Sequence, residues 1–322
     1  MKNNYVIGID IGNSDVKTAN NSFPTGYVET FSKPPLSDEK DYIEYNGNFY
    51  VLSESRFPYT RDKSNDDKMF ILSIIAIAKE LNGKVKELPS VPVNVTLAIG
   101  LPPMHMQSLR DKYVNYYKLH FGDGVAITYL GKNLTLLLSD VEVYPQNLAA
   151  ITVWKDKKAD SIAKKFRRFC AIDIGGYTVD KIFVDNGKPQ IDKCFSKELG
   201  VLRMYESIVA FVDSEFGLFL DNNDIEDVLR NRETVIPENV RTQIKRQAHL
   251  WIKKIFNEIA QSGTTLAATP TIFLGGASMM LKSNINTLAK ENNMTIEFIP
   301  GTRANASAYQ IITIARNKQQ GR

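Results

Sequence analysis

In the segment Asp10-Ile11-Gly12-Asn13-Ser14-Asp15-Val16-Lys17, from which the architecture of the chain can be inferred, a short polar turn joins two apolar strands. Tyr5–Asp10 predicts a buried strand, and Val16–Ala19 predicts the strand that returns beside it. The stretch Asp173-Ile174-Gly175-Gly176-Tyr177-Thr178-Val179-Asp180 repeats this pattern in the second half of the chain. Two hairpins that open two halves in the same way indicate a duplication.

Both hairpins carry residue types that suit the phosphates of a nucleotide. Asp10 and Asp173 end the first strand of each hairpin, where a carboxylate can hold Mg²⁺ through water molecules. Glycines let backbone N–H groups approach phosphate oxygens, hydroxyl groups add donors, and a lysine supplies a point charge. The candidate phosphate ligands are Gly12, Asn13, Ser14, Lys17, Gly175, Gly176, Tyr177 and Thr178. One such hairpin is also typical of an ordinary glycine-rich turn, but two in the same register favour a phosphate clamp.

The remaining patterns predict two α/β halves. With 322 residues, the chain is long for one hydrophobic core, so two domains are expected. Short strands and loops are expected over Phe23–Arg61. Helices are predicted over Asp66–Leu81, Met106–His120, Ala277–Glu291 and Ala304–Ala315, and strands over Leu134–Leu138, Val141–Tyr144 and Thr271–Leu274.

Composition argues against several classes of protein. The chain is 43% hydrophobic and 24% charged, which is typical of a soluble globular protein, and its net charge of +4 offers no basic groove for direct nucleic-acid binding. Two cysteines and three histidines argue against a zinc site and fit a reducing cytoplasm. No signal peptide is expected, and Met69–Ala78 is too short for a membrane span of roughly 20 residues. That run predicts a buried helix instead.

Other catalytic motifs do not occur in the sequence. It has no GxxxxGK[ST] phosphate loop, no GxGxxG after a strand, no HExxH and no GxSxG. The paired hairpins are therefore the feature of the sequence that best indicates a function.

The hairpins resemble those of the ATPase superfamily that contains actin, heat-shock chaperones and sugar kinases. The family has five characteristic segments, and this chain offers a match to each in order. The matches are Asp10–Lys17, Val143–Ala150, Asp173–Asp180, Ile272–Ala277 and Asn305–Tyr309. The resemblance spans nearly the whole chain, and its most specific parts are the two hairpins and Gly275-Gly276. It implies an α/β, actin-like (ribonuclease H-like) duplicated two-domain fold with a central nucleotide cleft.

The resemblance also implies a domain organisation and a ligand. Domain I would span residues 1–160, with a small subdomain at about 22–90, and a C-terminal helix at 301–322 would pack back onto it. Domain II would span 161–300, with a small helical subdomain at about 201–240. The ligand would be ATP with Mg²⁺, and GTP stays open as the alternative. Gly275, Gly276 and Ala277 would lie against the adenosine, although a glycine pair also suits a tight turn between a strand and a helix.

Gln146 lies where many bacterial relatives carry Glu and where actin carries Gln. A carboxylate could accept a proton from the attacking water, whereas an amide can only orient that water through hydrogen bonds. The resemblance therefore implies that Gln146 positions the water, with Asp10 and Asp173 completing the catalytic set. Arg241 and Lys245 lie in a region where relatives contact the nucleoside, but their one-turn spacing on a helix favours a solvated basic face.

Ala98-Ile99-Gly100-Leu101-Pro102 is similar to a Gly-Leu-Pro strand end in the ParM/StbA plasmid-segregation actins. This similarity implies a cytoplasmic ATPase that assembles with itself into filaments and drives segregation of plasmid or other replicon DNA. A DNA-binding adaptor protein would link the filament to centromere-like DNA, and no membrane partner is expected. Two alternatives remain, a small-molecule kinase of the sugar-kinase type and a nucleotide-binding scaffold with negligible turnover.

Overall fold

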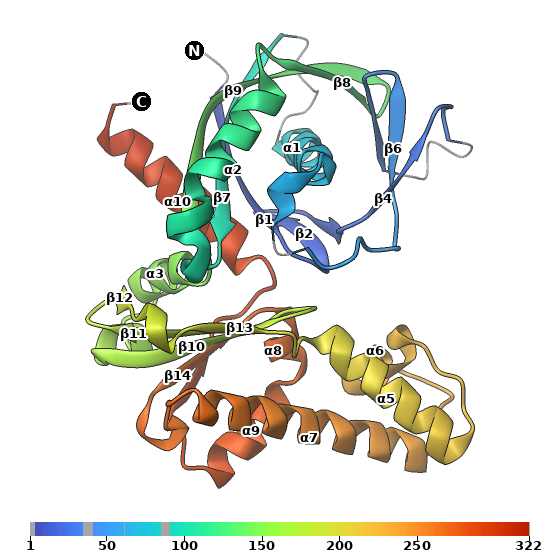
Figure 1. Cartoon of the computed structure of the whole chain (residues 1–322), viewed down its shortest axis with the longest axis vertical. Coiled ribbons are helices and arrows are strands. Elements are labelled where there is room, and N and C mark those ends of the chain that lie inside the picture. The colour runs from blue at the N-terminus through green and yellow to red at the C-terminus, as the bar shows by residue number, and fades with distance from the viewer. Residues whose placement is uncertain (1–3, 35–40, 61, 85–90, 322) are drawn as a thin grey trace. The chain divides into compact units, whose positions relative to one another are not determined.

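The computed structural model describes residues 4–34, 41–60, 62–84 and 91–321, which form two compact units (Figure 1). Unit 1 consists of Met1–Val153 together with Arg303–Arg322, and unit 2 is the continuous segment Trp154–Thr302. The chain therefore begins unit 1, builds the whole of unit 2, and returns to unit 1 with its last helix.

The strands of unit 1 form one nine-stranded sheet in the order β3-β2-β1-β7-β9-β8-β5-β6-β4. They are β1 (Asn4–Ile11), β2 (Asp15–Thr18), β3 (Ser22–Pro24), β4 (Tyr27–Thr30), β5 (Tyr42–Tyr45), β6 (Asn48–Leu52), β7 (Val93–Leu101), β8 (Val125–Tyr129) and β9 (Lys132–Pro145). The helices of unit 1 are η1 (Lys63–Asn65), α1 (Lys68–Lys84), η2 (Pro103–His105), α2 (Met106–Phe121) and α10 (Ala304–Gln319), and α3 (Leu148–Lys157) crosses into unit 2.

Unit 2 contains a six-stranded sheet with the main order β12-β11-β10-β14-β15, and β13 pairs with β11. Its strands are β10 (Arg168–Ile174), β11 (Val179–Asp185), β12 (Lys188–Pro189), β13 (Phe195–Lys197), β14 (Thr271–Leu274) and β15 (Ile296–Phe298). Its helices are α4 (Ile162–Lys165), η3 (Ile191–Lys193), α5 (Val201–Phe216), α6 (Asn222–Leu229), α7 (Glu238–Gln261), η4 (Leu266–Ala268), α8 (Gly276–Met280) and α9 (Lys282–Glu291).

The two sheets share a central topology. In unit 1, β1 pairs antiparallel with β2 and parallel with β7, which pairs parallel with β9. In unit 2, β10 pairs antiparallel with β11 and parallel with β14, which pairs parallel with β15. Three antiparallel strands followed by two parallel ones occur in the same spatial order in both units, which supports the duplication predicted from the paired hairpins.

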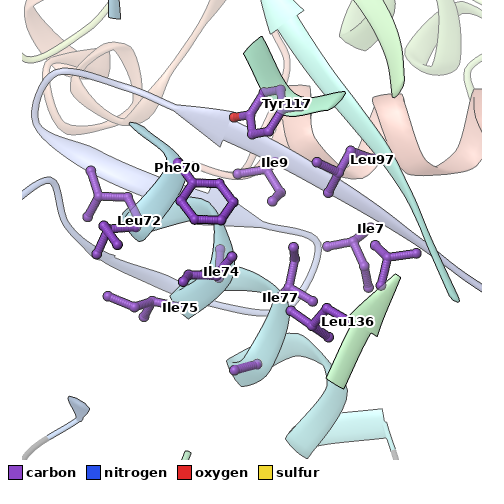
Figure 2. Close-up of a cluster of buried hydrophobic side chains, with 14 of the residues drawn as sticks. Ile7, Ile9, Phe70, Leu72, Ile74, Ile75, Ile77, Leu97, Tyr117 and Leu136 are labelled. Atoms are coloured by element: carbon purple, nitrogen blue, oxygen red, sulfur yellow. The ribbon is translucent and has the colours of Figure 1, made fainter. Parts of the chain in front are cut away.

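The core of unit 1 is built around α1. Residues 69–78 are apolar on nearly every face of this helix, and their side chains are buried because the sheet curves around it (Figures 1 and 2). Ile7 and Ile9 of β1 join the same cluster, as do Leu97 of β7 and Tyr117 of α2 (Figure 2). Since strand side chains alternate between faces, Gly8 points to the opposite face.

Helix α10 covers this opposite face at very short range. A Cβ atom on Gly8 would lie 2.0 Å from the Ala306 carbonyl oxygen, and one on Gly100 would lie 2.0 Å from the Tyr309 hydroxyl oxygen. Neither distance is tolerable for carbon and oxygen, so only glycine lets the helix approach β1 and β7 so closely. Packing of the last helix therefore explains the glycine in the Gly100-Leu101-Pro102 segment.

The core of unit 2 lies between its sheet and helices α5, α7 and α9. Cys170, Ile172 and Ile174 of β10 point into it, and Cys170 is fully buried. Trp154 and Trp251 are half-buried, and Trp251 packs against this core. Their indole N–H groups donate to Glu297 Oε1 at 3.0 Å and to the Leu199 carbonyl at 3.0 Å, respectively.

Two predicted elements differ from the structure. Leu134–Leu138 and Val141–Tyr144 belong to the single strand β9, which pairs with β8 at its start and with β7 along the rest, and a bulge absorbs Ser139. The helix predicted over Ala277–Glu291 is divided into α8 and α9 at Leu281. That residue is buried in the core and has φ −91° and ψ 14°, outside the range of a regular α-helix.

Glu297 of β15 is a buried carboxylate that accepts hydrogen bonds from the first residues of unit 2. One oxygen accepts hydrogen bonds from the Trp154 indole (3.0 Å) and the Lys158 ammonium (2.7 Å), and the other accepts from the Ile162 N–H (2.7 Å). Burial raises the pKa of Glu297, but these three hydrogen bonds outweigh burial, and the net pKa is below its usual range.

We expect this carboxylate to contribute stability that depends on pH. Because the folded pKa is lowered, the contribution is present above the unfolded pKa of about 4.3 and is lost as pH falls through the folded value. Glu297→Gln should lower the free energy of unfolding by about 1–3 kcal/mol at pH 7 and make it less sensitive to pH below about 4.5. Urea unfolding at pH 7 and pH 4 measures this, with the exposed Glu291→Gln as control. Equal losses in both variants at pH 7 would contradict the expectation.

Candidate functional site

The two Asp-Ile-Gly hairpins have the same register and the same turn. Asp10 lies opposite Lys17 in the first, and Asp173 lies opposite Asp180 in the second. The N–H of Gly12 donates to the Asp15 carbonyl at 3.0 Å, and the N–H of Gly175 donates to the Thr178 carbonyl at 2.9 Å. In each hairpin the glycine closes a turn whose next residues can present backbone N–H groups to an anion.

In unit 1 the structure brings three predicted site residues together. Asp10 is buried at the end of β1, and Lys17 lies on the same face of the sheet because the two are directly opposite on antiparallel strands. The Gln146 side chain reaches this place from the turn after β9, and its Nε2 donates to Asp10 Oδ1 at 3.3 Å. With its amide nitrogen facing Asp10, Gln146 can use its Oε1 to accept a hydrogen bond from a water molecule.

A buried pair of asparagines holds the turn that carries Gln146. Asn147 has φ 64°, in the left-handed region that asparagine tolerates better than most residues. Its N–H donates to Asn305 Oδ1 at 2.9 Å, and Asn305 Nδ2 donates back to Asn147 Oδ1 at 3.0 Å. Two of the matched segments, Val143–Ala150 and Asn305–Tyr309, therefore meet at this pair, and α10 fixes the position from which Gln146 points.

In unit 2 the strand end at Gly275 lies against Asp173. Gly275 has φ 89°, and a Cβ atom there would lie 2.1 Å from Asp173 Oδ1. In the hairpin itself, Thr178 Oγ1 donates to Asp180 Oδ2 at 2.9 Å, so Asp180 orients the Thr178 hydroxyl. Of the three residues predicted to contact adenosine, Ala277 is buried in α8, whereas Gly275 and Gly276 are partly exposed.

Gly200, at the start of α5, contacts the second hairpin, and the sequence analysis did not identify it as a site residue. The N–H groups of Gly200, Val201 and Leu202 donate to the carbonyls of Tyr177, Gly175 and Gly176 at 2.8–3.0 Å. A Cβ atom on Gly200 would lie 2.3 Å from the Tyr177 carbonyl carbon. Helix α5 thus holds the hairpin through its carbonyl groups. The sequence offers one signal for this contact, a glycine immediately before a helix.

The remaining candidates have ordinary partners. Arg241 pairs with Glu238, and Lys245 Nζ donates to Asn231 Oδ1 at 2.8 Å, which fits a solvated basic face. Within the residues that the structure describes, no cluster of three or more His, Cys, Asp or Glu side chains could hold a metal ion. The helices in that part of the chain also include none that is long and apolar enough to cross a membrane.

Two family models match the chain, one in each half. The model described as the N-terminal domain of actin-like proteins matches residues 8–148, and the C-terminal model of archaeal MreB-like actin homologues matches residues 171–287. Each match includes one of the two hairpins. Among curated proteins, none matches the sequence significantly.

Solved structures of actin homologues have the same fold. The archaeal actin homologue Ta0583 superposes with a TM-score of 0.76 at 16% identity, covering 96% of this chain and 99% of the homologue. A ParM filament from Clostridium botulinum gives 0.73 at 18% identity, with 97% and 99% covered. ParM of Bacillus thuringiensis with ATP gives 0.68 at 14% identity, with 98% and 100% covered. These likenesses confirm the duplicated two-domain α/β fold predicted from the sequence.

Proposed function

The chain belongs to the actin-like superfamily, and on this premise we propose that it is a filament-forming ATPase that binds and hydrolyses Mg-ATP. The observation that carries the proposal is the pair of hairpins with matched register and turn geometry, one in each unit. Relatives add support, because Ta0583 has been solved with ADP, B. thuringiensis ParM with ATP and C. botulinum ParM as a filament. Units 1 and 2 would be the two domains, with small subdomains at residues 22–90 and 201–240.

The backbone and side chains of the hairpins would bind the phosphates of one nucleotide. Gly12, Asn13 and Ser14 would contribute from unit 1, with Lys17 as a point charge, and Gly175, Gly176, Tyr177 and Thr178 would contribute from unit 2. Gly275, Gly276 and the backbone at Ala277 would contact the adenosine. The positive φ of Gly275 and its closeness to Asp173 support this role. They place the end of β14 directly beside the carboxylate that is proposed to hold Mg²⁺.

The donor set fits Mg²⁺ held through water. Mg²⁺ usually keeps several waters and is held by one or two carboxylates plus phosphate oxygens rather than by a protein cage. Asp10 and Asp173 provide such carboxylates, one at each first-strand end, and the described residues contain no larger acidic cluster. When bound, Mg²⁺ would neutralise charge on the phosphate oxygens.

Gln146 would position the water that attacks the terminal phosphorus atom. The new bond forms between this water and phosphorus, the bond from phosphorus to the ADP oxygen breaks, and the water proton leaves to phosphate or solvent. Positioning and charge stabilisation dominate phosphoryl transfer, so an amide suffices for this step. The hydrogen bond from Gln146 Nε2 to Asp10 restricts the amide to one orientation.

We further propose that the filament drives segregation of plasmid or other replicon DNA in the cytoplasm. The small net charge of +4 supports an adaptor that binds DNA in place of direct contact by the filament. The free thiols Cys170 and Cys194 are compatible with a reducing compartment.

Light scattering and phosphate release after addition of Mg-ATP test the proposal, with negative-stain microscopy of the same samples. We expect scattering to rise, phosphate to appear, and filaments to be visible. A protein that stays monomeric at high concentration would contradict the filament proposal. Turnover that requires an added sugar or acid would indicate a small-molecule kinase. Binding without turnover would indicate a nucleotide-dependent scaffold, the alternative that an amide at position 146 keeps open.

A further inference from the structure

Lys63 reaches the first hairpin from a segment that the sequence did not connect with it. This residue opens the short helix η1, and its Nζ donates to the Ile11 carbonyl oxygen at 2.5 Å. Ile11 lies between the candidate Mg²⁺ carboxylate of Asp10 and the turn glycine, Gly12. The ammonium of Lys63 is therefore held at the hairpin that is proposed to bind phosphate.

The backbone of Lys63 is fixed from two sides. Asp62 caps η1 by accepting hydrogen bonds from the N–H of Ser64 at 3.0 Å and from its hydroxyl at 2.6 Å. The Lys63 N–H donates to the hydroxyl of Tyr113, a buried residue of α2, at 3.2 Å. A fixed backbone limits the region that the Lys63 ammonium can reach, which lowers the entropic cost of binding a ligand there.

Among the residues that the structure describes, the acidic neighbours Asp62 and Asp66 of Lys63 already pair with other lysines. Asp62 pairs with Lys112 at 2.6 Å, and Asp66 pairs with Lys68 at 3.1 Å. Burial lowers the pKa of Lys63 to about 8; the charge of Asp10 opposes this shift, and that of Lys17 adds to it. Lys17 and Lys63 therefore carry two positive charges near the single negative charge of Asp10. This excess of positive charge favours binding of an anion.

There is also space beside Lys63. A cavity of about 100 Å³ within unit 1 is lined by Ile11 and Asn13 of the first hairpin, by Lys63, and by the apolar side chains of Phe57, Met69 and Leu72. The four-carbon stem of a lysine can pivot into such a space while the backbone stays fixed. The cavity reaches Asn13, one of the predicted phosphate ligands.

We propose that Lys63 is a phosphate-binding residue of the nucleotide site, acting with Lys17 on the side of the first hairpin. This assignment rests on the proposed nucleotide binding. A lysine ammonium has three N–H donors. One is used by the Ile11 carbonyl, and the others are directed to phosphate oxygens once the nucleotide is bound.

Dissociation constants for ATP, ADP and adenosine, measured with Mg²⁺ by calorimetry at protein concentrations that show no light scattering, test this assignment. We expect Lys63→Met to weaken ATP and ADP binding by about tenfold or more and to leave adenosine binding unchanged, because a charged hydrogen bond to phosphate is lost. Lys63→Arg, which keeps the charge, should recover most of the affinity. Lys68→Met is the matched control, because Lys68 lines the same cavity but pairs with Asp66.

Two results would overturn the assignment while leaving the proposed function intact. One is ATP binding by Lys63→Met at the parental affinity. The other is an equal loss for ATP and adenosine, which would mean that Lys63 only supports the fold. A parent protein that binds none of the three ligands would overturn the proposed function, and the assignment with it.

Discussion

Gln146→Ala is expected to lower the rate of ATP hydrolysis about a hundredfold while nucleotide affinity changes little. The variant removes the amide that would orient the attacking water, and misplacement of a reacting group by about 1 Å costs a factor of this size. Affinity should survive because the phosphate ligands belong to the hairpins and not to the turn after β9. Single-turnover phosphate release and nucleotide titration measure the two quantities separately.

Gln107→Ala is the control for this variant, because Gln107 is an exposed glutamine on α2. It should hydrolyse ATP at the parental rate. If Gln146→Ala also kept the parental rate, the role assigned to Gln146 would be wrong. If it lost nucleotide binding as well, the contact with Asp10 would matter for the site's structure and not for positioning water.

Gly275→Ala should abolish most nucleotide binding and destabilise the protein by about 3–5 kcal/mol, the range of a severe single substitution. The new Cβ atom would lie 2.1 Å from Asp173 Oδ1 and 2.9 Å from the Ile174 carbonyl oxygen. The carboxylate or the strand end has to move, and both belong to the proposed site. Urea unfolding and a nucleotide titration on the same sample check the two effects.

Gly187→Ala separates backbone strain from this steric conflict. Gly187 has φ 75°, close to the value at Gly275, but a Cβ atom there would meet nothing within 4 Å. Its substitution should cost about 1–3 kcal/mol from the unfavourable backbone conformation and leave nucleotide binding unchanged. Similar losses of stability and of binding in both variants would show that the contact with Asp173 is unimportant.

The sequence was most informative where local chemistry determines local structure. The Asp-Ile-Gly hairpins were predictable because turn glycines and flanking apolar strands specify a register without help from distant residues. The buried helix α1 was predictable because a run as apolar as residues 69–78 has no stable place at a surface.

Long-range contacts set the limits of sequence-based prediction. The single strand β9 depends on two partners, β8 and β7, and its bulge is visible only once both are paired. Lys63 is placed by Tyr113, fifty residues further along the chain. The glycine at position 100 makes sense only with Tyr309 against it. In each case the decisive partner is far away in sequence, and no short pattern encodes the pairing.

The division of unit 1 between both ends of the chain also has a consequence during synthesis on the ribosome. Residues 154–302 are contiguous, so unit 2 has all of its own residues as soon as that stretch has emerged. Unit 1 has to wait for α10, which lies against Gly8 and Gly100, before the second face of its sheet is covered. The segment translated first is thus the last to be completed, and until the final helix appears the nascent chain carries an uncovered sheet surface that chaperones could bind.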